Sequence, residues 1–369
     1  MLEWKLIRLG DICITNKNSY SSKDNWKFVN YLDTGSLTEN KITELQYINT
    51  KTDKMPSRAR RKVMKNSILY STVRPNQLHY GIIKEPVDNL LVSTGFIVID
   101  VDTNKAIPEF IYYLLTQNNT TVQLQAIAEQ SVSTYPSIKS SDIENLEFKL
   151  PNLILQSKIV SILDTIDSKI RQNEKINKNL EQQAQAIFDD MFPDIFSLNT
   201  DATLQDLIVF ANGKKRPKTI GNIPVYGGNG ILAYTDKSNA DNCVIIGRVG
   251  AYCGNTFLCL DKCWTSDNAI QAKSRTGSSP LFIYYLLRNA SLSSRHIGTG
   301  QPLMTQGILN AIPIKYPVEE KISAFIETCS PIHKMISGNR QQNESLASIR
   351  DSMFPKLMSG EMDVSELNL

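Results

Sequence analysis

Phe110-Ile111-Tyr112-Tyr113-Leu114-Leu115 is the stretch that decides the fold, because it returns unchanged at residues 282–287. Each copy follows a strand-like segment and a proline, and each is predicted to begin an amphipathic helix. Two further matches keep the same order in both copies: KIVSILDTI at 158–166 with KISAFIETC at 321–329, and Met191-Phe192-Pro193 with Met353-Phe354-Pro355. Solenoid repeats are shorter, at about 20–50 residues. The chain is therefore predicted to be a tandem duplication of one large unit.

The first part of each copy is predicted to be rich in β-strands. Short apolar runs separated by Gly, Asn and Pro are typical of strands joined by turns. These runs lie at 67–70 and 95–99 in the first copy, and at 243–247 and 269–272 in the second.

The second part of each copy is predicted to be a long helix. From 155 to 191 the apolar residues mostly recur at steps of three and four, without Gly or Pro. The matching stretch, 319–354, keeps this stripe but contains Pro331 and Gly338, so we expect a kink or break near 331–338. A stripe about 55 Å long is too long for one small domain to cover. We therefore expect the two helices to pack on each other, antiparallel; the alternative is that each belongs to a separate domain.

These features predict an α+β fold with two duplicated mixed α/β domains, separated by two long helices packed as an antiparallel coiled coil. The expected parts are a first domain at 1–151, a first central helix at 152–192, a second domain at 199–316, a second central helix at 317–355 and a tail at 356–369.

The composition is that of a globular protein. Its 369 residues suffice for two domains of about 150 residues each, and 41% hydrophobic with 21% charged residues argues against disorder. No apolar run reaches the roughly 18 residues of a membrane helix, and residues 1–5 lack the layout of a signal peptide. We expect a cytoplasmic protein whose six cysteines are reduced.

Charge is clustered, although the net charge is only +3. Between residues 51 and 65 there is one acid, Asp53, and seven basic residues: Lys51, Lys54, Arg58, Arg60, Arg61, Lys62 and Lys65. A second cluster is Lys214-Lys215-Arg216-Pro217-Lys218. Such clusters suit contact with phosphates; the alternative for each is a solvated surface loop.

Motifs of catalysis are missing from the sequence. Residues 227–230 (GGNG) are followed by Ile231-Leu232 and not by the Lys-Ser/Thr of a P-loop, so they predict a tight turn. There is no Asn-Pro-Pro-Tyr or Asp-Pro-Pro-Tyr string of an amino-methyltransferase. Glu319-Glu320-Lys321 resembles the end of a nuclease motif, but it opens a helix and has no paired acid just upstream.

A zinc site is the alternative for the cysteines of the second copy: Cys243, Cys253, Cys259 and Cys263. Their spacings contain no Cys-x-x-Cys pair and no nearby His. Buried thiols in a β-rich core are the favoured interpretation. The three histidines, His79, His296 and His333, stand in unrelated contexts, which disfavours acid–base catalysis.

With this organisation in hand, the chain resembles the specificity (S) subunits of type I restriction–modification systems. The resemblance is carried by the start of the first long helix: Leu150-Pro151-Asn152-Leu153, Gln156, Ile159-Val160 and Leu163-Asp164-Thr165-Ile166-Asp167. The second copy keeps Pro317, Ile322 and Ile326-Glu327 but loses the Gln and the Leu-Asp-x-Ile-Asp wording. Residues 4–12, 223–230 and 264–269 are also typical of that family.

The resemblance implies that each recognition domain reads one half of a split double-stranded DNA target. The helices would set the gap between the halves and dock two methyltransferase subunits, which bind S-adenosylmethionine. Restriction motor subunits, which use ATP and magnesium, can join them. The specificity subunit itself catalyses nothing and holds no cofactor or metal.

Reading of bases requires planar donors and acceptors, so loops with Arg, Asn and Gln are the candidates, and cations suit phosphates. The candidate DNA-binding residues of the first domain are Lys54, Arg58, Arg60, Arg61, Lys62, Arg74, Asn76, Gln77, Tyr80, Ser133, Thr134 and Tyr135. Those of the second domain are Lys214, Lys215, Arg216, Tyr226, Asn229, Arg248, Asn255, Thr299 and Gln301.

Two other classes of protein remain open from the residues alone. A duplicated protein-binding adaptor would explain the helices but not the two basic clusters. A fragment of a fused enzyme is disfavoured by the missing catalytic motifs.

Overall fold

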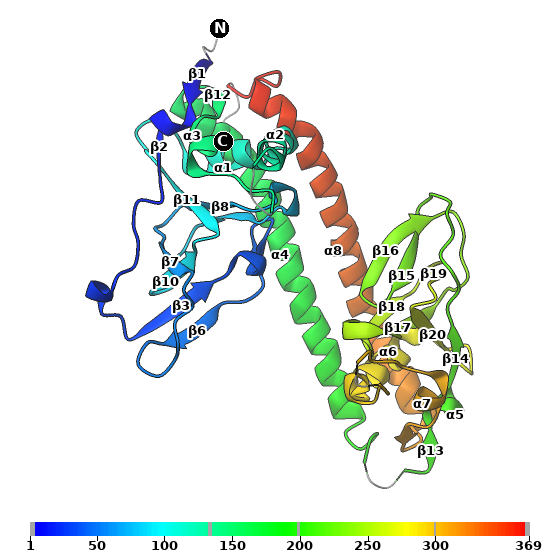
Figure 1. Ribbon diagram of the computed structural model, residues 1–369. Helices are drawn as coiled ribbons and strands as arrows, with labels where there is room; N and C mark the ends of the chain where they lie inside the picture. Colours follow the sequence, from blue (N-terminus) through cyan, green and yellow to red (C-terminus); the bar gives the residue numbers. More distant parts are fainter. Residues whose placement is uncertain (1–3, 132–134, 198–199, 299, 366–369) are drawn as a thin grey trace. The chain divides into compact units, whose positions relative to one another are not determined.

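The computed structural model describes residues 4–131, 135–197, 200–298 and 300–365, and it divides into two compact units. Unit 1 is formed by residues 1–170 and 344–369, and unit 2 by residues 171–343. The two long helices, α4 (Leu153–Met191) and α8 (Glu319–Ser359), each contribute one end to unit 1 and the other to unit 2 (Figure 1). Among the described residues, no helix is long and apolar enough to cross a membrane.

Unit 1 is built on two four-stranded sheets. One has the order β2 (Cys13–Thr15), β11 (Phe96–Val101), β8 (Ser67–Ser71) and β9 (Tyr80–Ile83) and is antiparallel throughout. The other has the order β6 (Gln46–Asn49), β3 (Phe28–Leu32), β10 (Leu90–Ser93) and β7 (Ala59–Lys62), with β10 parallel to β3. Two further pairs are β1 (Lys5–Arg8) with β12 (Glu147–Leu150), and β4 (Leu37–Thr38) with β5 (Lys41–Ile42). The helices of this unit are α1 (Pro108–Thr116), α2 (Asn118–Glu129) and α3 (Ser140–Glu144).

Unit 2 repeats this plan. Its antiparallel sheet has the order β14 (Ile208–Asn212), β20 (Ala269–Ser274), β17 (Cys243–Gly247) and β18 (Thr256–Cys259). Its second sheet has the order β16 (Gly230–Thr235), β15 (Ile223–Gly227) and β19 (Trp264–Thr265), with β19 parallel to β15. β13 (Ala202–Thr203) pairs with β21 (Pro313–Ile314), and the short helices are α5 (Leu204–Leu207), α6 (Pro280–Asn289) and α7 (Gln306–Asn310). The predicted duplication is confirmed.

The repeated six-residue stretch forms the same helix in both copies, as predicted. α1 and α6 each begin at a proline, which suits the first helical turn because its N–H would be unpaired there. In α1 the apolar side chains of Phe110, Ile111, Leu114 and Leu115 are buried in the core of unit 1. Their counterparts in α6 are buried in the core of unit 2. Burial of each such side chain contributes about 1.5–3 kcal/mol.

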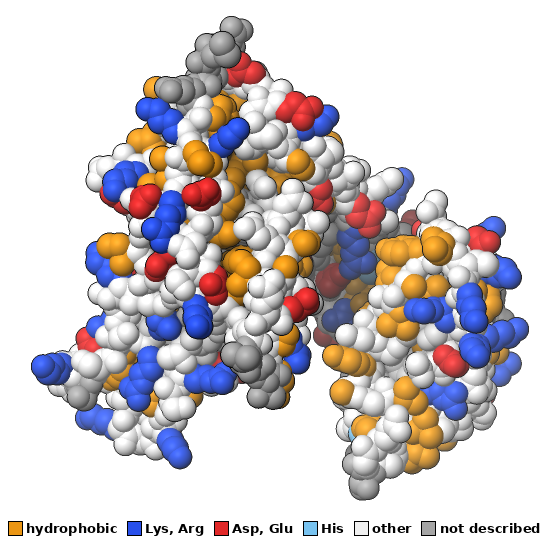
Figure 2. Space-filling model, turned by 45° about the horizontal axis from the view of Figure 1, so that its top comes forward, with side chains coloured by type: hydrophobic (Ala, Val, Ile, Leu, Met, Phe, Trp, Pro, Cys, Tyr) orange, Lys and Arg blue, Asp and Glu red, His pale blue; other side chains and the backbone are white. Residues whose placement is uncertain are grey.

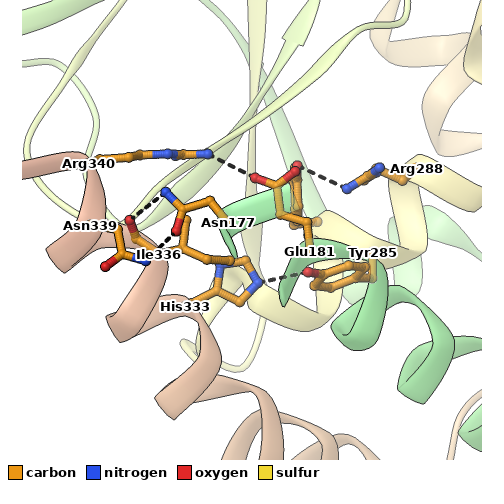
Figure 3. A network of polar contacts seen from close by, with 9 residues as sticks. Asn177, Glu181, Tyr285, Arg288, His333, Ile336, Asn339 and Arg340 are labelled. Carbon is orange, nitrogen blue, oxygen red and sulfur yellow. Dashed lines mark hydrogen bonds and ion pairs between the residues drawn. The ribbon is translucent and has the colours of Figure 1, made fainter. Parts of the chain in front are cut away.

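The long helices pack antiparallel within each unit, as predicted. In unit 1, Arg350 Nη1 lies 2.9 Å from Asp167 Oδ1. In unit 2 the order along the helices is the same: Asn173 Nδ2 donates to Asn343 Oδ1 at 2.8 Å, and the Phe188 and Phe325 rings are 5.5 Å apart further along. Between them, Asn339 Nδ2 donates to Asn177 Oδ1 at 2.8 Å (Figure 3).

The expected break near 331–338 is wrong, because α8 passes through Pro331 and Gly338 without interruption. Phe325, Cys329 and Ile336, on either side of the proline, are at most 2% exposed. Their burial offsets the backbone hydrogen bond that the proline removes.

The described part of the expected tail, residues 356–365, contributes to a helix and to a core. α8 continues past Pro355 to Ser359. Leu357, Met358 and Val364 are buried in the core of unit 1.

Candidate nucleic-acid interface

Three loops of unit 1 meet at one end of its sheets. The loop between β8 and β9 is held on one side by a hydrogen bond from Thr72 N to Gly95 O at 2.7 Å. On the other side, Ile138 N donates to Thr72 O at 2.8 Å and Arg74 N donates to Pro136 O at 3.0 Å. The turn between β8 and β9 is thus fixed between the β10–β11 turn and the segment that leads into α3.

Arg74 stands in this turn in a conformation that is rare for its type. Its φ of 48° is left-handed, and Pro75 follows it in a buried position. Such a backbone costs about 1–3 kcal/mol and persists only where the surroundings impose it. The guanidinium lies 5.3 Å from the centre of the Tyr135 ring. The exposed side chains of Arg74, Asn76 and Gln77 therefore project from a firmly held turn.

Unit 2 holds its equivalent turn in the same way. Arg248 N donates to Asn268 O at 3.0 Å, which matches the bond from Thr72 to Gly95. Met304 N donates to Arg248 O at 2.8 Å, which matches the bond from Ile138 to Thr72. The Nε of Arg248 is buried without a hydrogen-bond partner among the described residues.

The hairpin of β15 and β16 adds its tip to this group of loops. A Cβ at Gly247 would lie 2.3 Å from Tyr252 O and 2.7 Å from Gly228 O, so only glycine permits the hairpin tip and the β17–β18 turn to approach so closely. Asn229 is exposed at that tip and Asn255 at the end of the turn. Lys214 joins them, because its N–H donates to Thr265 O at 2.9 Å.

The predicted basic cluster of unit 1 spans a turn and an edge strand: residues 51–58 precede β7, and residues 60–62 lie on it. β7 ends its sheet, and Lys54, Arg58 and Arg60 are exposed along it or just before it. Arg61 is half-buried; burial lowers its pKa, and its Nε has no hydrogen-bond partner among the described residues. Lys62 is already engaged, because its ammonium pairs with Asp24 and lies 5.3 Å from the Trp26 ring centre.

Not all of the predicted DNA-binding residues are exposed on these loops. Tyr80 is only 7% exposed and its ring stacks on Tyr70 at 5.7 Å, so this candidate is buried in the unit and not presented on its surface. Burial, with the nearby Glu39 carboxylate second, raises its pKa to about 12. Tyr226 is half-buried beside Phe257, at 6.2 Å between ring centres. Ser133, Thr134 and Thr299 lie outside the described residues, whereas Gln301 is exposed beside Pro302, whose carbonyl accepts from Gly250 N at 2.9 Å.

Sequence reasoning missed Tyr252, which is 48% exposed in the turn after β17, and Asn268, whose carbonyl holds Arg248. Asn268 contributes through its main-chain carbonyl, which its residue type does not reveal. On the face drawn in Figure 2, Lys and Arg side chains gather at the end of unit 1 that carries β3, β6 and β7, with few acidic side chains among them. Unit 2 likewise shows a group of Lys and Arg side chains with few acids.

The cysteines of unit 2 are buried, as predicted. Cys243, Cys259 and Cys263 pack with Ala240, Ile245 and Ala269 in one apolar cluster. The described residues contain no group of three or more His, Cys, Asp or Glu side chains that could hold a metal ion.

A family model described as "Type I restriction modification DNA specificity domain" matches residues 1–182 and again residues 200–344. The chain belongs to this family. The type I specificity family includes the HindI specificity subunit of Haemophilus influenzae, which is 36% identical over 196 residues, or 53% of this chain and 42% of the relative. The match thus spans less than half of that relative's length. The MjaIX specificity subunit of Methanocaldococcus jannaschii is 24% identical over 78% of this chain and 76% of the relative.

A solved member of the type I specificity family has the same fold. The S subunit of a type I restriction–modification system from M. genitalium aligns with a TM-score of 0.58 at 16% identity, over 99% of this chain and 97% of that one. At this identity the likeness concerns the fold alone.

Proposed function

We propose that this chain is the DNA-reading subunit of a type I restriction–modification enzyme. Each unit reads one half of a split double-stranded target, and the long helices carry two methyltransferase subunits. One observation carries the proposal: both copies match the specificity family, and each presents the same three loops with exposed cations and planar amides.

The side chains on these loops divide by chemistry. Lys54, Arg58 and Arg60 in unit 1 are suited to phosphates, which fix orientation without reading sequence. In unit 2 the phosphate candidates are Lys214, Lys215 and Arg216, all of them exposed.

Base reading falls to the planar groups on the held turns. Arg74 can address guanine with two parallel bonds, and Asn76 or Gln77 can address adenine. In unit 2 the candidate groups for base reading are Arg248, Asn229, Asn255 and Gln301. An unpartnered Nε at Arg248 supports this role, because a buried donor without a partner is costly unless a ligand completes it.

In this proposal, methylation and cleavage of the DNA are carried out by other chains. The methyltransferase subunits bind S-adenosylmethionine, and restriction motor subunits, where present, bind ATP and magnesium. This chain contributes recognition only, in the cytoplasm where the DNA lies.

The proposal is tested by co-expressing the chain with the adenine methyltransferase encoded beside it and mapping methylated sites. We expect a stable complex and methylation at one split sequence. Replacing residues 200–315 by the same region of a relative should change only one half of that sequence. A complex that assembles but does not bind DNA would favour the adaptor alternative, and a change in both halves would contradict two separate readers.

A further inference from the structure

The outer edge of β9 in unit 1 is covered by the chain itself. β9 pairs with β8 so that Ser71 N donates to His79 O at 2.9 Å. Antiparallel pairs alternate between bonded and non-bonded, so the backbone groups of Tyr80 and Ile82 point away from β8. Asn40 forms hydrogen bonds with both groups: its backbone N–H donates to Tyr80 O at 2.9 Å, and its side-chain Oδ1 accepts from Ile82 N at 2.9 Å.

Asn40 reaches this edge from the tight turn between β4 and β5. Glu39 and Asn40 have φ of 45° and 64°, the left-handed values of a two-residue hairpin turn. Gly81 allows the approach, because a Cβ there would lie 2.9 Å from Asn40 Oδ1.

The equivalent edge in unit 2, that of β18, is open. Gly247 N donates to Asn255 O at 2.8 Å, as Ser71 does to His79, so Thr256 and Leu258 correspond to Tyr80 and Ile82. Among the described residues, no hydrogen bond reaches Thr256 O or leaves Leu258 N. β15 and β16 correspond to β3 and β6, between which the β4–β5 turn is inserted in unit 1. Only Gly228 and Asn229 join β15 to β16, so the described residues of unit 2 contain no counterpart of that turn at this place.

A groove of about 920 Å³ lies along this open edge, in the size range of ligand sites. β18 forms one wall, and α4 and α8 contribute Glu181, Ile336 and Arg340 to the opposite side. Ile231 at 48% and Leu260 at 42% are exposed beside it and offer apolar contact.

The charge on the helix side of the groove is unbalanced. Arg340 Nη2 lies 2.9 Å from Glu181 Oε1, and Arg288 Nη1 donates to the Tyr284 hydroxyl at 3.3 Å (Figure 3). Arg340 lines the groove, and Arg288 adjoins it through Tyr284, so two guanidinium groups accompany the one carboxylate of Glu181. Asp261 and Lys262, which also line the groove, offset each other. In unit 1 the matching tyrosine, Tyr112, lies within electrostatic reach of Asp167, Arg350 and Glu39, and Glu39 is the neighbour of Asn40.

We propose that the groove along β18 binds an extended segment of a partner protein, with an acidic residue followed by an amide residue, as Glu39-Asn40 serves β9. An N–H of the segment donates to Thr256 O, and a backbone or side-chain carbonyl of the segment accepts from Leu258 N. This is strand addition to a sheet. The carboxylate of the segment faces Arg340 and Arg288. This site adjoins the candidate DNA-binding loops at Gly230 and Thr256, but it does not rest on the proposed function.

The test uses the full chain and a capped peptide of its own residues 36–43, SLTENKIT, added in trans. Hydrogen exchange followed by mass spectrometry reports on the amides of β18. At a peptide concentration about ten times its dissociation constant, exchange at Leu258 should slow about tenfold. Asn40→Ala in the chain is the positive control, because it should speed exchange at Ile82 in unit 1.

Anisotropy of the labelled peptide then measures binding to matched variants. Leu258→Pro removes the outward N–H, which an edge strand tolerates, together with part of the packing of this side chain on the core of unit 2, and it should abolish binding. Leu258→Val keeps the N–H and should bind as the parent does. Peptides with E39Q or N40A should bind more weakly.

Unchanged exchange at Leu258 with saturating peptide would overturn the proposal, as would equal binding to the Pro and Val variants. Self-association of the chain that Leu258→Pro abolishes would make a second copy the occupant and overturn the assignment to a different protein.

Discussion

Tyr285 and His333 are hydrogen-bonded at 2.8 Å, between the tyrosine hydroxyl and the imidazole Nε2, in a buried position of unit 2. The tyrosine at the same place in unit 1, Tyr113, donates instead to Asp167 at 2.9 Å. The duplicated helix thus anchors to a long helix through the same residue with two different partners.

Burial lowers the pKa of His333 to about 4, and Arg340 and Arg288 act in the same direction. In the unfolded chain the imidazole takes up a proton below about pH 6.5. Between these values the unfolded state binds more protons, so the free energy of unfolding falls as the pH drops from 6.5 to 4. Between pH 7.5 and 5 the parent should lose about 2 kcal/mol more than His333→Gln.

Urea unfolding followed by Trp264 fluorescence measures this difference, in a background where Trp4 and Trp26 are replaced by Phe. Equal losses in the two proteins would mean that His333 is not held neutral by the fold.

Asp167 accepts hydrogen bonds from two groups of unit 1, Tyr113 and Arg350. Asp167→Ala leaves both without their partner, and the free energy of unfolding should fall by about 1–3 kcal/mol. Asp167→Asn keeps an acceptor for Tyr113 and should cost less. The matched control is Asp351→Ala, because Asp351 also pairs with Arg350 but its side chain is 66% exposed. That variant should lose no more than about 1 kcal/mol, and a larger loss would place the important contact at Asp351.

Arg58 and Arg60 should contribute to DNA affinity through phosphates. Replacing both by Ala should weaken binding to every sequence and lower the slope of log affinity against log salt by about 1–2 units. Lys62→Ala is the control, because Lys62 is paired with Asp24 inside the unit, and it should leave the slope unchanged. DNA-binding titrations at several salt concentrations measure the slope. An unaltered slope in the double variant would mean that β7 does not belong to the interface.

Arg74 should read a base and not a phosphate. Arg74→Lys keeps the charge but loses the planar fork, so it should relax one half of the target without changing the salt slope. The correct sequence should bind about 1–3 kcal/mol more weakly. Binding to a library of half-site variants measures the preference. Undiminished preference in Arg74→Lys would assign base reading to another turn of unit 1.

Sequence patterns predicted the duplication, the two central strands of each antiparallel sheet and the two long helices, because each depends on a repeated or periodic apolar pattern. They failed at Pro331 and Gly338, where local propensity opposes the helix and burial of Phe325, Cys329 and Ile336 prevails. Helix propensity is a local property of the sequence, whereas this burial depends on packing against α4, which lies more than a hundred residues away.

The candidate interface was predictable by chemistry but not by exposure. Arg74 and Tyr80 stand six positions apart, yet one is exposed and the other is buried against Tyr70. Lys62 has the charge that suits a phosphate contact, but it pairs with Asp24 of the same unit, which is remote in sequence. The open edge of β18 could not be predicted, because it differs from the edge of β9 only through a contact with Asn40, which lies about forty residues before β9 in the β4–β5 turn.

The division of the chain has a consequence for synthesis on the ribosome. Unit 2 is one continuous stretch, 171–343, whereas unit 1 needs residues beyond 344 to complete its core, including Leu357 and Met358. Translation delivers these side chains last, and domains fold as units once their residues are available. The half of the protein that is begun first is therefore finished second. Until those residues are synthesised, the apolar helix face at Leu155, Ile159 and Leu163 remains exposed to solvent. In that interval the nascent chain should bind chaperones.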